Sequence, residues 1–113
     1  MKKFKDAFNG LKEGLKHRAI AIQFVLGVLA VIGGFIIKLD TNEWLAFIIC
    51  IGVVIVSEIF NTCIEKICDF VEPEKNDKIR TIKDLAAGGV LCASIMALIV
   101  CIYITINKLG GLR

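Results

Sequence analysis

The stretch that decides the fold is Trp44–Ile64, which reads WLAFIICIGVVIVSEIFNTCI. It is apolar except for a few polar residues near its end, and its length is about that of a helix crossing roughly 30 Å of hydrocarbon. Two similar runs flank it, Ala19–Ile37 and Leu85–Ile106. Backbone groups in lipid must satisfy their hydrogen bonds internally, so all three runs are predicted to be transmembrane helices.

The composition agrees with a membrane protein. Of the 113 residues, 57% are hydrophobic, and the mean hydropathy is +0.76. A soluble domain of this size buries too little surface to hide so many apolar side chains. A water-soluble helical oligomer is the alternative, and the length of the apolar runs counts against it. The five cysteines have no CxxC spacing, which indicates packing rather than a metal or disulfide site.

Basic residues gather on one side of the predicted membrane. Lysine and arginine are frequent before the first span and between the second and third spans, whereas the first connection has only Lys38. Because positive charge marks the cytoplasmic side, the amino terminus and the second connection are predicted to lie on the cytoplasmic side of the membrane. These charges flank membrane spans, so they do not indicate nucleic-acid binding.

The chain is predicted to be a single all-α integral membrane domain over 1–113. Phe4, Phe8, Leu11 and Leu15 recur at helical spacing opposite a basic face. This pattern is typical of an amphipathic helix on the membrane surface, or of an anchor that only orients the first span. Either Asp40 or Thr41 is expected to cap the second span, and Pro73 to end it. The predicted segments are a surface helix at 1–18, spans at 19–38, 44–68 and 81–107, and a cytoplasmic loop at 69–80.

A polar stripe runs along the second span: Glu58, Asn61, Glu65 and Asp69. At roughly 100° per residue these side chains fall within an arc of roughly 80°. Ionisable groups inside a membrane are costly and are functional candidates by default. Glu58 stands out because a long apolar run precedes it, and it is suited to accept a proton. The alternative is a buried carboxyl group bonded to a neighbouring helix.

A second polar cluster, Lys83 and Asp84, begins the third span at the same predicted depth as Asp69. Lysine neutralises phosphate charge, and carboxylates are the hard oxygen ligands that Mg²⁺ prefers, so this cluster can hold a polyphosphate with its metal ion. The sequence contains no glycine-rich phosphate loop, which excludes the common nucleotide-binding folds.

These two clusters carry a resemblance to a known family. The segment Glu58–Asp69 fits the pattern E-x-x-N-x-x-[IV]-E-x-x-x-D, and Lys83–Val90 fits K-D-x-[AG]-[AS]-[AG]-x-V. Together they resemble the prokaryotic diacylglycerol kinases, which include undecaprenol kinases of Gram-positive bacteria. The resemblance implies an ATP- and Mg²⁺-dependent lipid kinase, a homotrimer with active sites between subunits. It favours undecaprenol as the substrate, with diacylglycerol as the alternative.

The resemblance also implies a role for each matching residue. Glu58 matches the catalytic base, Glu65 matches a metal ligand, and Asn61 supports the same site. The residues implied to meet the nucleotide are Asp69, Glu74, Lys75, Asn76, Lys83 and Asp84.

One departure from the family lies just before the first span. Where the family has a second metal-binding glutamate in E-R-N-F-x-I-H, this chain has His17 in the stretch His17–Gln23. Three alternatives stay open: Glu13, one turn earlier on the same face, is a substitute ligand, His17 binds the phosphate or metal itself, or the site holds Mg²⁺ more weakly. The departure leaves two alternatives of another class, a non-catalytic membrane subunit and a proton-relaying transporter. Lys83 and Asp84 favour the kinase, because a proton relay does not need them.

Overall fold

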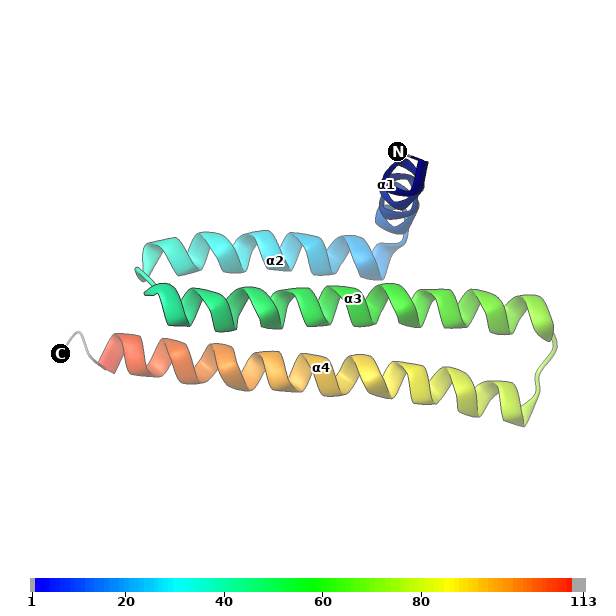
Figure 1. The fold of residues 1–113 in the computed structure, drawn as a ribbon. Coiled ribbons are helices and arrows are strands. Elements are labelled where there is room, and N and C mark those ends of the chain that lie inside the picture. The colour runs from blue at the N-terminus through cyan, green and yellow to red at the C-terminus, as the bar shows by residue number, and fades with distance from the viewer. Residues whose placement is uncertain (1, 111–113) are drawn as a thin grey trace.

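The computed structural model describes residues 2–110 as helices joined by short connections (Figure 1). The helices are α1 (Lys2–Leu15), α2 (Arg18–Ile36), α3 (Thr41–Val71) and α4 (Asp77–Gly110). The last three run antiparallel and are each long and apolar enough to cross a membrane. The all-α membrane fold predicted from the sequence is therefore confirmed. Residue 1 of the predicted surface helix and residues 111–113 of the predicted domain lie outside the described residues.

The central helix α3 starts earlier than the predicted residue 44. The side chain of Asp40 accepts a hydrogen bond from the backbone of Glu43, and the side chain of Glu43 accepts one from the backbone of Asp40, both at 2.9 Å. This reciprocal capping satisfies two amides that a helix start leaves free. Of the two possible caps, Asp40 is the one used, and the helix begins at Thr41.

The connection between α3 and α4 is shorter than the predicted loop 69–80. Helix α3 ends at Val71, ahead of Pro73 as predicted, and α4 starts at Asp77 rather than near Thr81. The early start has a local cause, because Asn76 Oδ1 accepts hydrogen bonds from the next free amides, those of residues 78 and 79, at 2.9 and 3.2 Å.

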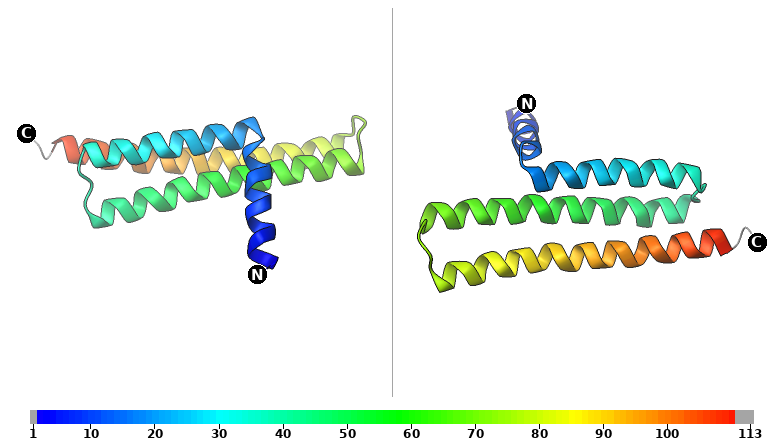
Figure 2. Two further views of the ribbon diagram at one scale, coloured as in Figure 1. Left: turned by 90° about the horizontal axis from the view of Figure 1, so that it is seen from above. Right: turned by 180° about the vertical axis from the view of Figure 1, so that it is seen from behind.

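Helix α3 is the element against which both α2 and α4 pack. Its buried positions include Phe47, Val54, Asn61 and Cys68, which are seven residues apart. A seven-residue repeat of buried positions is the pattern of long helices that pack side by side with a slight left-handed twist. Seen from above, α2 lies over α4 along much of its length with α3 to one side, so the helices do not form a flat layer (Figure 2).

A cluster of buried hydrophobic residues lies at the α2–α3 connection. Leu39, Phe47 and Ile104 are buried there together, and the ring of Trp44 packs 6.1 Å from that of Phe47. An ion pair of 2.8 Å between Lys108 and the capping residue Glu43 ties α4 to α3 at the same end. The polar stripe lies toward the opposite end, where α3 and α4 extend beyond α2 (Figure 1).

Helix α1 leaves the bundle at a bend and does not continue α2 (Figure 2). Its phenylalanines are open to the surroundings, Phe4 being 66% and Phe8 65% exposed. A helix whose apolar side chains find no partner in the bundle suits a membrane surface.

Candidate active site

The polar stripe of α3 changes from buried to exposed along its length. Glu58 is 9% exposed and Asn61 8% exposed, whereas Glu65 and Asp69 are open to the surroundings. Because the residues lie on successive turns of one helix, the stripe runs from the bundle interior to the α3–α4 connection. The structure therefore separates a buried carboxylate from two accessible ones.

Glu58 is a buried acidic residue whose carboxylate has no bonding partner in the described part of the chain. Among residues 2–110, no hydrogen bond or ion pair reaches its carboxylate. The alternative that the sequence left open, a buried carboxyl group bonded to a neighbouring helix, is therefore not found within one chain. Its backbone carbonyl accepts a second hydrogen bond, from Thr62 Oγ1 at 3.0 Å. Unlike the amide oxygen of Asn61, the carboxylate oxygens of Glu58 are not fully shielded, so a group from outside the chain can reach them.

Asn61 and Glu65 form a pair one turn further along. Asn61 Nδ2 donates a hydrogen bond of 2.8 Å to Glu65 Oε1. The other amide atom, Asn61 Oδ1, is fully buried and has no hydrogen-bond partner. A free amide oxygen beside a carboxylate is a donor set that fits Mg²⁺.

The described part of a single chain does not assemble the metal-ligand set that the sequence suggested. Glu13 instead pairs with Lys16 at 3.2 Å, and both side chains are largely exposed. His17 caps the start of α2, but its side chain makes no capping hydrogen bond. No group of three acidic, histidine or cysteine side chains among residues 2–110 is arranged to hold a metal ion. Glu65 is therefore not joined by Glu13 and His17 within one chain.

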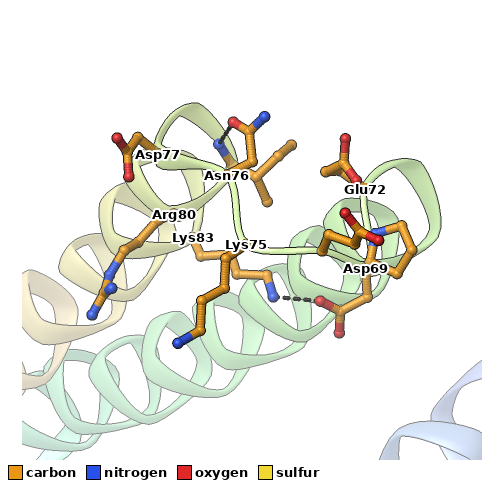
Figure 3. A pocket seen from close by; sticks show the side chains of 10 residues that line it. Asp69, Glu72, Lys75, Asn76, Asp77, Arg80 and Lys83 are labelled. Carbon is orange, nitrogen blue, oxygen red and sulfur yellow. Dashed lines mark hydrogen bonds and ion pairs between the residues drawn. The ribbon is translucent and has the colours of Figure 1, made fainter.

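A pocket of about 270 Å³ lies where α3 and α4 meet their connection (Figure 3). Lys83 forms an ion pair with Asp69 across it, which joins the two polar clusters predicted from the sequence. The pocket is also lined by three residues that were predicted to contact the nucleotide, Glu74, Lys75 and Asn76. Asp84 is exposed and does not line it.

The pocket is basic on one side. In Figure 3 the side chains of Lys75, Arg80 and Lys83 extend toward one side of the connection, where Asp69 pairs with Lys83, whereas those of Glu72 and Asp77 extend toward the other. Arg80 was not predicted as a site residue. Its spacing from Lys83 could have identified it, because residues three apart in a helix lie on the same face. Three cations facing one concave surface suit a polyphosphate.

The fold and these groups define a small membrane-embedded enzyme with its polar residues at one end of a three-helix bundle. Over residues 5–105 the chain matches the family described as prokaryotic diacylglycerol kinase, and it belongs to that family. It is also 28% identical over 109 residues to the undecaprenol kinase of Bacillus subtilis (strain 168), covering 96% of this chain and 89% of that protein. The protein is a lipid kinase of the membrane, and ATP is the co-substrate that its family implies.

The pocket predicts that Lys83 carries nucleotide affinity. Replacing it in Lys83→Met should raise the KM for ATP about tenfold or more, which corresponds to about 1.4 kcal/mol of lost binding. Lys78→Met is the matched control, because Lys78 is on the same helix but does not line the pocket. Steady-state kinetics with varied ATP measure both variants, and equal KM values for the two would contradict the assignment.

Proposed function

We propose that this chain transfers the γ-phosphoryl group of ATP to the hydroxyl group of undecaprenol, using Mg²⁺. The observation that carries the proposal is the buried, unpaired carboxylate of Glu58, on the same helix face as Asn61, Glu65 and the ion-paired Asp69. The choice of undecaprenol is supported by the similarity to a kinase for that lipid.

In the proposed reaction, Glu58 accepts the proton of the lipid hydroxyl. The alcohol oxygen then forms a bond to the γ-phosphorus as the bond from that phosphorus to the β–γ bridging oxygen breaks. ADP leaves with that oxygen, and the lipid phosphate remains in the membrane. General base catalysis of this kind contributes about 10²–10⁴ in rate, and positioning of the two substrates contributes the rest.

The nucleotide is proposed to lie in the pocket at the α3–α4 connection. Lys83, Lys75 and Arg80 would neutralise its phosphate oxygens, and Asn76 holds the start of α4 beside them. Asp69 fixes the ammonium group of Lys83 and so aims it into the pocket. Asp84, next in sequence, is assigned to the same nucleotide by its match to the family motif.

Glu65 and the free oxygen of Asn61 are the groups proposed to hold Mg²⁺, which when bound neutralises the charge of the ATP phosphates. Two protein ligands are a reasonable number for this ion, because Mg²⁺ usually takes its remaining ligands from water and substrate phosphates. His17 and Glu13 are proposed to complete the site from another subunit.

A homotrimer with its sites facing the cytoplasm is proposed: two observations support an oligomer, and the number three comes from the resemblance to the family. A single bundle leaves Glu58 without any partner, and in a bilayer such a group normally faces protein or a water-filled cavity. Gly88 and Gly89 also have open space at the positions where side chains would begin, which leaves α4 free for the close approach of another helix. The basic residues around the α3–α4 connection support the cytoplasmic orientation.

A phosphotransfer assay tests the proposed substrate. Purified protein with Mg²⁺ and labelled ATP should phosphorylate undecaprenol in mixed micelles, with a kcat/KM at least about tenfold above that for diacylglycerol. A higher value for diacylglycerol would reject undecaprenol as the substrate. Absence of labelled product from both lipids would reject the proposed reaction and favour a non-catalytic subunit.

The metal assignment predicts opposite effects of two substitutions. Glu65→Gln should raise the Mg²⁺ concentration for half-maximal rate by about tenfold or more, because it removes a charged ligand. His17→Glu restores the carboxylate of the family pattern and should lower that concentration. Asp6→Asn, a similar change of charge on the exposed face of α1, should leave it unchanged. Identical Mg²⁺ dependence in all three variants would contradict the assignment.

A further inference from the structure

The contact surface between α3 and α4 is built from pairs of residues that face one another. At the α2–α3 end, Glu43 on α3 forms its ion pair with Lys108 on α4. One turn inward from that pair, Phe47 and Ile104 are buried together. Because the two helices are antiparallel, each step forward along α3 is matched by a step back along α4 (Figure 1). These two pairs therefore determine which residues meet further along the surface.

The next pair inward is Cys50 on α3 with Cys101 on α4. Each cysteine lies three residues beyond its helix's member of the buried phenylalanine–isoleucine pair, so it is one turn further along the same face. Counting back from the ion pair of Asp69 with Lys83, at the other end of the surface, gives the same pairing to within one residue.

The surroundings of the two cysteines agree with this pairing. Both line a groove of about 400 Å³ that lies between α2 and α4 with α3 as its floor. Their thiol groups are close enough to interact electrostatically, and both are free and half-buried. The spacing in the sequence did not indicate this pair, because antiparallel packing brings together two residues that are far apart along the chain.

Two facing thiols can bind a soft metal cation or form a disulfide bond. Thiolates suit a cation such as Cu(I). However, two thiolates around one monovalent cation leave a net negative charge, which is costly within the apolar part of three membrane-spanning helices. A disulfide bond is neutral, because the thiol protons leave together with the electrons. The position of the pair therefore favours the disulfide.

We propose that Cys50 and Cys101 form a disulfide bond that holds α4 against α3, and that a quinone dissolved in the membrane is the oxidant. One S–S bond forms as two S–H bonds break, and both protons and both electrons pass to the quinone, which leaves as the quinol. A quinone dissolves in hydrocarbon and can reach half-buried thiols in an apolar groove. The charged thiol reductants that keep cysteines reduced in cytosol do not enter hydrocarbon, so they do not remove the bond.

The bond is expected to stabilise the folded state. It joins residues that already face one another, so it mainly constrains the unfolded chain, in which the two cysteines are far apart. It also holds the pairing of α3 with α4, on which the ion pair of Asp69 with Lys83 at the candidate site depends.

The test oxidises the intact protein in liposomes with a benzoquinone that is fully substituted, so that thiols form no stable adduct, and that carries a short alkyl tail. Two thiols per chain should become resistant to alkylation, one quinol should form for each disulfide, and mass spectrometry of unreduced peptides should find Cys50 linked to Cys101.

Unfolding in dodecyl sulfate measures the stabilisation, followed by the fluorescence of Trp44, the one tryptophan, which packs at this end of the bundle. The equilibrium constant for unfolding should be at least about tenfold lower after oxidation than after reduction with dithiothreitol. Cys101→Ala should lose both the linkage and this difference. Cys92→Ala is the matched control and should keep both, because Cys92 is exposed on the same helix outside the groove.

Three results would overturn the proposal. In the first, the quinone leaves every thiol open to alkylation. In the second, the linked peptides contain Cys63 or Cys92, which assigns the oxidation to contacts between copies of the chain. In the third, the link between Cys50 and Cys101 forms, but unfolding is the same in the oxidised and reduced protein. If Cys101→Ala does not fold, Cys50→Ser removes the same bond with little change of volume and is judged by the same criteria.

Discussion

A carboxylate buried in an apolar helix is the constraint on which the rest of this structure depends. Glu58 is buried near the end of a long apolar run, and nothing in the described part of the chain bonds to its carboxylate. A charge in such a place is strongly unfavourable unless a partner, a substrate or a proton compensates for it. The position of this one group explains why the polar residues gather on a single face of α3.

One end of the bundle holds the helices together, and the other end carries the polar residues of the candidate site. At the α2–α3 connection, the aromatic cluster of Trp44 and Phe47 and the ion pair of Glu43 with Lys108 hold the helices in register. At the other end, α3 and α4 extend beyond α2 (Figure 1), and a pocket lined by both basic and acidic side chains lies at their connection. The contacts at the first end fix the register of the helices, and this register also determines which polar residues face one another at the second end.

Much of this architecture could be predicted from the sequence, because the dominant signals are local. Apolar runs long enough to cross a bilayer predicted the three spans, and helical spacing predicted that Glu58 and Asn61 share a face. The early start of α4 was not predicted, because the charge-dense segment around Asn76 was interpreted as loop and its capping role was overlooked.

Other features depend on packing that no local pattern encodes. A groove of about 400 Å³ between α2 and α4 follows from how these two helices lie on α3, and it brings together residues as far apart in the sequence as Gly27 and Ala97. The set of Glu65, Glu13 and His17 was suggested by alignment to a motif, but one chain does not assemble it. The proposed completion of this set by neighbouring subunits is outside what a single sequence specifies.

The most direct test of the account measures both ATP binding and phosphotransfer in Glu58→Gln. The amide keeps the size of the side chain and cannot accept the proton. Transfer to undecaprenol should fall by about 10²–10⁴, while the dissociation constant for ATP should stay within about twofold, because the nucleotide pocket is separate from Glu58. Phosphotransfer at the unmodified rate in E58Q would contradict the central claim that this buried carboxylate is the proton acceptor.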